Sequence, residues 1–295
     1  MEIGVVFPQT DIGSDVGAIR AYAQTVEGLG YRHVMIYDHV LGADPAKHEN
    51  WNGHYDMNDA FHEPFVLYGY LAGVCSLDLM TSIIALPQRQ TVLVAKQAAE
   101  VDLLTRGRLR VGVGLGWNRV EYHALGKEFS TRGKRMEEQI KLLRLLWTEP
   151  SVTFDGTYES IDGAGLNPMP LQRPIPLWYG GESEVAYKRA GRVADGWIPD
   201  NMLPGPKLDE AKSVVESAAR EAGRDPATLG MQGRIKWGKD GARFSLERMV
   251  ELSRGWEESG ATHVAINTMY AELKSMDEHI EVLTNVAEAL DLTRA

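Results

Sequence analysis

The sequence predicts an α/β protein, a single (β/α)8 TIM barrel with insertions that spans residues 1–295. Three observations point to this fold. Eight short apolar runs alternate with segments of helical periodicity, polar or glycine-rich residues follow several of these runs, and the length suits a barrel of ~250 residues with insertions. Because crossovers between parallel strands are right-handed, this alternation favours a closed barrel over an open doubly wound sheet.

The predicted strands are short and rich in apolar and β-branched residues. In chain order they are Ile3–Phe7, His33–Tyr37, Leu79–Leu86, Leu109–Gly114, Pro176–Tyr179, Asp195–Ile198, Leu229–Lys236 and Thr262–Ile266. Apolar residues at the helical repeat predict the helices Val16–Leu29, Phe65–Val74, Ala95–Leu104, Tyr122–Trp147, Glu182–Ala190, Leu208–Ala222 and Leu246–Glu258, with a last helix through Ile280, Leu283, Val286 and Leu290.

The stretch Lys96–Asn118 contains a helix, a tight reversal, a strand and a glycine-rich exit. A dinucleotide-binding fingerprint would require a glycine at the position of Trp117, so the sequence disfavours a Rossmann fold. In a parallel barrel, Gly114 and Gly116 would let a flat cofactor lie against bare backbone at the carboxyl end of the strand. Alternatively, the glycines only relieve crowding inside the barrel.

Two segments interrupt the barrel repeat. Periodicity disappears between residues 40 and 64, where histidines and aromatic rings accumulate. A loop of this length is usually functional, and we expect an aromatic-rich lid. Its three histidines match no compact ligand spacing, so no metal site is predicted. Residues 151–174 contain the hairpin signal Asp155-Gly156 and a Gly/Pro-rich connector, which together look like an insertion.

The composition limits the possible partners. The chain has 31 basic and 41 acidic side chains, a formal charge of −10. This charge repels phosphate backbones and anionic membrane surfaces, so we expect a small-molecule substrate and neither a nucleic acid nor a membrane partner. Cys75 is the single cysteine, no signal sequence precedes the first strand, and no apolar run approaches the ~20 residues of a membrane span. We expect a soluble cytoplasmic protein that forms a homodimer.

Two motifs follow predicted strands, at the end of a barrel where active sites lie. Asp38-His39 follows the second strand, and Gly180-Gly181-Glu182-Ser183 joins the fifth strand to a helix. Free amide N–H groups at such a helix start can bind a phosphate, although an ordinary strand-to-helix turn has the same composition.

The chain resembles the bacterial luciferase-like monooxygenase superfamily in three segments, GYRHVMIYDHV (30–40), TSIIALPQRQTVLVAKQAAEVDLLTRGRLRVGVGLGWNRVEYHALG (81–126) and PLWYGGESEVAYKRAGRVADGW (176–197). The resemblance is closest to the deazaflavin-dependent branch, which uses coenzyme F420. It covers most of the chain from Ile3 to Trp197 and weakens afterwards.

The resemblance implies that a flavin or deazaflavin lies at the carboxyl ends of the strands. His39 would lie beside the reactive ring and act in catalysis with Asp38, and the turn at Gly180-Gly181 would hold the cofactor phosphate. The family has a non-prolyl cis peptide behind the ring, which here would join Ser82 and Ile83. The implied cofactor contacts are Asp38, His39, Ser82, Ile83, Gly114, Gly116, Trp117, Gly180, Gly181, Glu182 and Ser183.

One departure from the family pattern bears on the substrate. Members that oxidise sugar phosphates have a glutamate soon after the fourth-strand glycines, where this chain has Trp117. This departure disfavours a sugar-phosphate dehydrogenase. We expect a small apolar or aromatic substrate in a pocket formed by Trp51, Tyr55, Phe61 and Trp117.

The sequence therefore predicts a coenzyme F420-dependent oxidoreductase that transfers a hydride between the deazaflavin C5 and a small organic substrate, with His39 as proton donor or acceptor. Two alternatives stay open. The same fold supports a two-component monooxygenase that uses reduced FMN and oxygen, and it also supports a flavin-binding protein without turnover. Fold alone does not decide among these functions.

Overall fold

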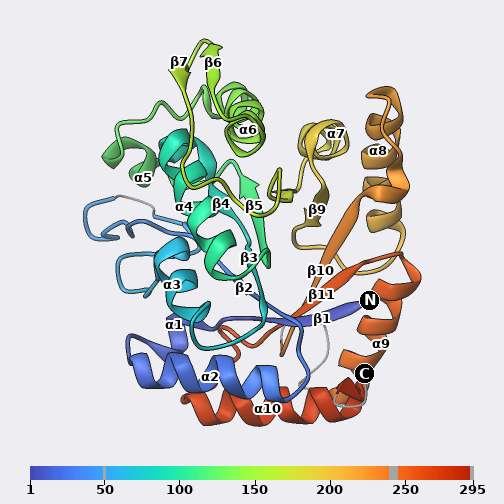
Figure 1. The fold of residues 1–295 in the computed structure, drawn as a ribbon. Coiled ribbons are helices and arrows are strands. Elements are labelled where there is room, and N and C mark those ends of the chain that lie inside the picture. The colour runs from blue at the N-terminus through green and yellow to red at the C-terminus, as the bar shows by residue number, and fades with distance from the viewer. Residues whose placement is uncertain (49–50, 239–244, 293–295) are drawn as a thin grey trace.

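The wall of the barrel is one sheet of nine parallel strands in the order β3-β2-β1-β11-β10-β9-β8-β5-β4. A computed structural model describes residues 1–48, 51–238 and 245–292. Pairing of β3 with β5 closes the sheet. Because β3 and β4 are two pieces of one strand, the wall has the eight positions of a (β/α)8 barrel, and the predicted fold is confirmed (Figure 1).

The strands and helices alternate along most of the chain. The barrel strands are β1 (Glu2–Val6), β2 (His33–Ile36), β3 (Asp78–Thr81), β4 (Ile84–Ala85), β5 (Leu109–Gly114), β8 (Leu177–Gly181), β9 (Gly196–Pro199), β10 (Gly230–Lys236) and β11 (His263–Asn267). The helices are α1 (Gln9–Ile12), α2 (Val16–Gly28), α3 (Pro64–Leu71), α4 (Thr91–Leu104), α5 (Arg119–Ala124), α6 (Arg132–Thr148), α7 (Glu184–Val193), α8 (Pro206–Glu221), α9 (Leu246–Glu258) and α10 (Met276–Ala289), with short 3-10 turns at Leu86–Gln88 and Pro226–Thr228.

The core has two layers, because inward and outward side chains alternate along each strand. The outward residues pack under the helices in one large apolar cluster that includes Val5, Leu79 and Trp147. The inward residues form a second cluster inside the barrel, which contains Val6, Met35, Tyr37, Met80, Trp178, Ile198, Ala265 and Met269. Among the described residues, no helix combines the length and apolar character needed to cross a membrane.

The third strand differs from its prediction. The sequence predicts one strand over Leu79–Leu86, but the structure divides it into β3 and β4. Between them, the peptide bond that joins Ser82 and Ile83 is cis, which confirms the expectation drawn from the resemblance. β3 pairs with β2 and with the start of β5, whereas β4 pairs with the end of β5. Apolar residues lie on both sides of Thr81-Ser82, and this short polar pair alone does not mark a break in the strand.

The predicted helix Tyr122–Trp147 is also wrong as a single element. It is two helices, α5 and α6, separated by residues 125–131. Gly126 lies in this connection with a φ of 65°, which L-residues rarely adopt. The side chain of Asn118 caps α5 by accepting from the N–H groups of Val120 and Glu121, so the helix begins earlier than predicted.

The two insertions lie where the sequence predicts them. β6 (Val152–Asp155) and β7 (Ser160–Ala164) form the expected antiparallel hairpin, which projects beside α6 in Figure 1. The Glu138 carboxylate on α6 accepts three backbone N–H groups of the hairpin turn, from Thr157, Tyr158 and Glu159. In the loop before α3, the described residues 40–48 and 51–63 form no helix or strand.

Candidate active site

A cavity of about 730 Å³ lies at the carboxyl ends of the barrel strands. Its volume is within the range of ligand-binding sites. Most of the site residues predicted from the sequence line it, namely Asp38, His39, Tyr55, Ser82, Ile83, Gly114, Gly116, Trp117, Gly180, Gly181, Glu182 and Ser183. Barrel closure therefore brings together motifs that are distant in the sequence.

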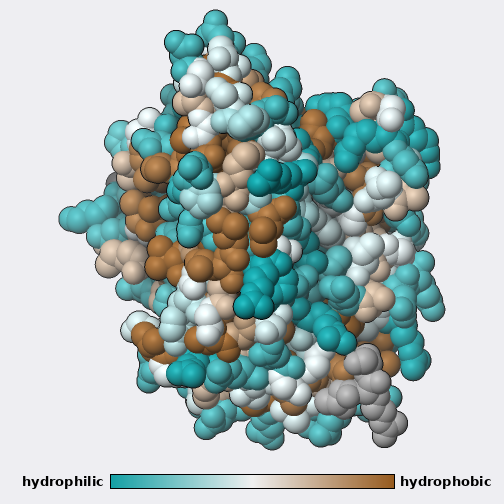
Figure 2. Space-filling view, viewed as in Figure 1, coloured by the Kyte–Doolittle hydropathy of each residue, from teal (hydrophilic) through white to brown (hydrophobic). Residues whose placement is uncertain are grey.

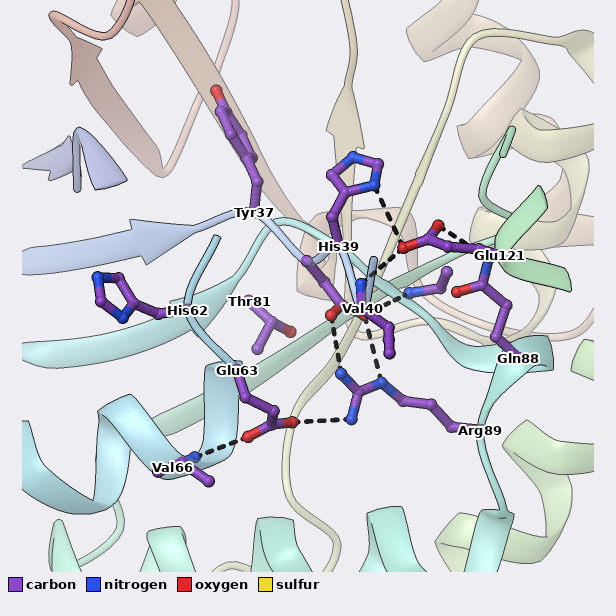
Figure 3. A network of polar contacts seen from close by, with 12 residues as sticks. Tyr37, His39, Val40, His62, Glu63, Val66, Thr81, Gln88, Arg89 and Glu121 are labelled. Carbon is purple, nitrogen blue, oxygen red and sulfur yellow. Dashed lines mark hydrogen bonds and ion pairs between the residues drawn. The ribbon is translucent and has the colours of Figure 1, made fainter. Parts of the chain in front are cut away.

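His39 projects from the end of β2 and is oriented by a carboxylate. Its Nδ1 lies 3.5 Å from Oε1 of Glu121, which is buried on α5 (Figure 3). The same carboxylate accepts from the backbone N–H of Val40 at 2.6 Å and from Nε2 of Gln88 at 3.2 Å. With Nδ1 directed at Glu121, the Nε2 atom of His39 is the one available for proton exchange.

Burial alone would raise the pKa of Glu121, because it penalises the charged form. The contacts from His39, the Val40 N–H and the Gln88 amide outweigh burial, and the pKa is lowered. Glu121 is therefore ionised at neutral pH and can stabilise a positive charge on the imidazole of His39.

Asp38 has a different environment from its neighbour. Its carboxylate accepts from Nη2 of Arg89 at 2.7 Å and from Nε of the same guanidinium at 3.3 Å, and the backbone N–H of Ala85 adds a third contact at 3.2 Å. Nη1 of Arg89 also binds Glu63, which caps α3 (Figure 3). These contacts link the end of β2 to β4 and to the start of α3. Asp38 therefore helps to position the segment that carries His39.

Ile83 forms part of the cavity floor. A Cβ atom on Gly114 would come within 2.7 Å of Ile83 Cδ1, and one on Gly180 would come equally close to its Cγ2. Real Cβ atoms do not tolerate such distances, so both positions require glycine for the Ile83 side chain to lie between them. In this structure these two glycines make room for Ile83, and Ile83 in turn faces the cavity.

The turn after β8 leads into the amino end of α7. Ser183 caps this helix, and its Oγ accepts from the N–H of Ala186 at 3.3 Å. The first turn of a helix presents N–H groups without intrahelical partners, and the helix dipole favours an anion there. Because Gly181 to Ser183 line the cavity, these amides can hold a phosphate at its edge.

The aromatic wall differs in part from the prediction. Tyr55 and Trp117 line the cavity, whereas Trp51 and Phe61 do not. Phe61 packs against the rings of His39 and Tyr55, each at a centroid distance of 4.7 Å, and Trp51 lies 5.8 Å from the ring of Trp117. Both residues support the wall from behind, since the lining positions are already filled by the rings that they contact.

A polar wall that the sequence does not reveal faces the cavity from the other strands. Arg234 on β10 donates to the Tyr37 hydroxyl at 3.0 Å and forms an ion pair with Asp200 at the end of β9. Burial alone would lower the pKa of Arg234, but the contacts with Tyr37 and Asp200 outweigh burial and the pKa is raised. Burial would also raise the pKa of Asp200, yet Arg234 lowers it. The charges of Arg234 and Asp200 compensate each other. This part of the cavity wall therefore carries no net charge from the pair and can bind a ligand through hydrogen bonds.

Several of these functional candidates leave only a weak signal in the sequence. Glu121 could have been found from Asn118, which is a typical N-cap and places the glutamate in the first turn of a helix beside the glycine-rich exit. Arg234 belongs to an alternating series of inward positions on a correctly predicted strand. Gln88 and Arg89 follow the predicted end of the third strand at Leu86, but the sequence does not show that they contact Glu121 and Asp38.

A family model described as luciferase-like monooxygenase matches residues 1–236 of the chain. The chain belongs to this family. Among luciferase-like relatives, an uncharacterised protein of Mycobacterium tuberculosis (strain ATCC 25618 / H37Rv) is 33% identical over 208 residues, which are 68% of this chain and 71% of that protein. The FMNH(2)-dependent dimethylsulfone monooxygenase of Pseudomonas fluorescens (strain Pf0-1) is 32% identical over 216 residues, 72% of this chain and 55% of the relative.

Solved structures of the luciferase-like fold also match. An F420-dependent secondary alcohol dehydrogenase in complex with an F420-acetone adduct superimposes with a TM-score of 0.80 at 20% identity, over 100% of this chain and 99% of that one. At this identity the similarity shows the fold. The matches therefore include a sequence relative named for FMNH2 and a structural neighbour named for F420, and the family consists of oxidoreductases and monooxygenases.

Proposed function

We propose that this luciferase-like protein is a coenzyme F420-dependent oxidoreductase that transfers a hydride between the deazaflavin and a small, neutral organic substrate. The observation that carries the redox role is the His39–Glu121 pair at the cavity, 3.5 Å apart, and the choice of F420 rests on the resemblance of residues 30–40 and 81–126 to the deazaflavin-dependent branch. Hydride transfer to or from an organic carbon changes the proton demand at a neighbouring atom, and an imidazole oriented by a carboxylate can give or take that proton.

The residues present fit a deazaflavin or a flavin. The N–H groups at the start of α7 offer a site for the cofactor phosphate, and the Ser183 cap itself adds no charge there. Ile83 offers an apolar surface for one face of a flat ring. Gly114 and Gly180 beside it have no side chains that would obstruct this surface. A bound deazaflavin would supply the hydride chemistry, while the protein supplies orientation and proton transfer.

The cavity wall also constrains the substrate. Tyr55 and Trp117 provide aromatic surface. The charges of Arg234 and Asp200, which also line the cavity, are paired with each other. An anion that bound at Arg234 would compete with Asp200 for this guanidinium, whereas a neutral molecule with one or two polar groups leaves the pair intact.

A two-component monooxygenase that uses reduced FMN and oxygen is the second candidate. The relative from Pseudomonas fluorescens favours it, since that protein is named as an FMNH2-dependent monooxygenase at 32% identity. The His39–Glu121 pair can serve either reaction, because both need a proton donor or acceptor beside the reacting atoms.

Equilibrium titration of the purified protein with coenzyme F420 and with FMN, each in its oxidised and reduced form, tests the proposal. We expect tighter binding of F420 and turnover of a carbonyl or alcohol substrate in the absence of oxygen. Tight binding of FMN with negligible binding of F420, together with oxygen-dependent turnover, would favour the monooxygenase.

A further inference from the structure

The hydroxyl oxygen of Tyr37 accepts two hydrogen bonds of 3.0 Å, from Nη1 of Arg234 and Nδ2 of Asn267. Both donor assignments are fixed by chemistry. A guanidinium has donors only. The amide of Asn267 cannot be reversed, because its Oδ1 accepts the backbone N–H of Met269 at 2.9 Å, which leaves Nδ2 to face Tyr37.

Two donors occupy the acceptor capacity of the Tyr37 oxygen, so its own proton is left for a third partner. Among the residues that the structure describes, none accepts this proton. Tyr37 lines the cavity, and in Figure 3 its side chain extends to the same side as that of His39, away from Arg89. The third partner therefore lies in the cavity.

The hydroxyl keeps its proton at neutral pH. Burial raises the pKa of Tyr37 and outweighs the opposing effect of Arg234. The group consequently presents a neutral O–H donor, and the Arg234 guanidinium and Asn267 amide fix the oxygen in place. Such a donor recognises an oxygen with free lone pairs and disfavours a ligand N–H at the same point.

We propose that the Tyr37 hydroxyl donates a hydrogen bond to a carbonyl or hydroxyl oxygen of the molecule bound in this cavity. The inference rests on the proposed function, in which two molecules carry such an oxygen, namely the ring of the deazaflavin and the organic substrate. Tyr37 thereby makes the cavity specific for a ligand that places an oxygen acceptor at this point. This contact is separate from those made by Asp38 and His39.

The test uses Tyr37→Phe, which keeps the ring and removes the donor. The first arm measures the dissociation constant of coenzyme F420, and of FMN, without substrate. The second arm uses the cofactor-loaded protein and compares the binding of cyclohexanone with that of methylenecyclohexane, which has a similar shape but no oxygen. Protein tryptophan fluorescence reports binding, because Trp117 lines the cavity.

If the oxygen belongs to the cofactor, Tyr37→Phe weakens cofactor binding about three- to tenfold. If it belongs to the substrate, the wild-type protein prefers cyclohexanone by a similar factor and the variant loses this preference. A variant that retains both the cofactor affinity and the binding of the two probes would overturn the inference. Failure of the wild-type protein to bind coenzyme F420 would instead refute the proposed function, so the two failures are distinguishable.

A second variant keeps the phenol in place. Asn267→Asp replaces the donor Nδ2 with a carboxylate oxygen, which can accept the Tyr37 proton and so withdraw it from the cavity. We expect the same weakening as for Tyr37→Phe. Tyr31→Phe is the matched control, because it removes a buried tyrosine hydroxyl that donates to the Leu283 carbonyl at 2.8 Å outside the cavity lining. It should lower the melting temperature without changing ligand affinity.

Discussion

The amino ends of the barrel strands contain a histidine that the structure requires to be neutral. Nε2 of His263 lies 2.7 Å from Nη1 of Arg110. Since a guanidinium only donates, Nε2 must accept, and the proton is on Nδ1, which donates to Oγ1 of Thr262 at 2.8 Å. Burial, reinforced by Arg110, lowers the pKa of His263 to about 3. The Glu2 carboxylate is 3.2 Å from the same Nε2, but it is half exposed, so water screens its attraction for a proton.

The sign of the pH effect follows from this depressed pKa. An unfolded chain has a histidine pKa of ~6.5, so it binds a proton more readily than the folded protein does. The stability that neutral His263 contributes to the folded protein is complete above about pH 6.5 and is lost as the pH falls toward 3. Between pH 7.5 and 5.0, the free energy of unfolding should fall by about 2 kcal/mol through His263 alone.

His263→Gln tests this reasoning, because its amide oxygen can accept from Arg110 and does not titrate. Urea unfolding at pH 7.5 and at pH 5.0 gives the free energy of unfolding of each protein. The wild-type protein should lose about 2 kcal/mol more than the variant. His123→Gln, which changes an exposed histidine on α5, should behave like the wild type. An equal pH dependence of His263→Gln and the wild type would refute the neutral assignment.

Other predictions concern the cavity and the surface. Ser183→Asp should preserve the α7 cap while repelling the cofactor phosphate, and it should weaken cofactor binding about tenfold or more in a titration, whereas Ser275→Asp at the α10 cap should not. His39→Asn should slow the chemical step roughly 10²-fold with cofactor affinity kept within a few-fold, and an unchanged single-turnover rate would reduce His39 to a positioning role. Val66 on α3 and Leu93 on α4 are 71% and 55% exposed within an apolar face over these adjacent helices (Figure 2), and we propose that this face joins two copies of the chain. Sedimentation should show a dimer that Val66→Glu with Leu93→Glu converts to a monomer, and a monomeric wild-type protein at micromolar concentration would contradict this proposal.

The barrel was predictable from the sequence because its signals are local. Alternating strands and amphipathic helices recur at short spacing, and each is encoded by residues that are neighbours in the chain. The division of the third strand was not predictable in the same way, since a single pair of polar residues, Thr81-Ser82, between two apolar runs is also common within one strand. The missed boundary between α5 and α6 did have a local signal, the glycine at 126, which the long apolar stripe outweighed.

From local patterns, the site was most predictable where a motif follows a strand end, and the family resemblance added Ser82 and Ile83. Asp38, His39 and the turn at Gly180-Gly181 could be located in this way. The Tyr37–Arg234 contact joins residues that are 197 positions apart, so it depends on which strands become neighbours when the barrel closes. The wrong placement of Trp51 and Phe61 in the pocket lining has a similar origin. Composition shows that a loop is rich in aromatic rings, but it does not show which of these rings face the cavity.

The contacts of Asp38 and His39 show how one dipeptide can serve two purposes. Adjacent residues at the end of a strand point in different directions, and here each meets a different partner. His39 is oriented by Glu121, while Asp38 binds Arg89 and the Ala85 N–H. Because Ala85 follows directly after the segment that carries Ile83, Asp38 couples the position of the imidazole to that of the cavity floor. Loss of the Asp38 carboxylate would leave the partly buried Arg89 with one acceptor fewer and disturb both surfaces together, so its effect on activity would arise through geometry and not through proton transfer.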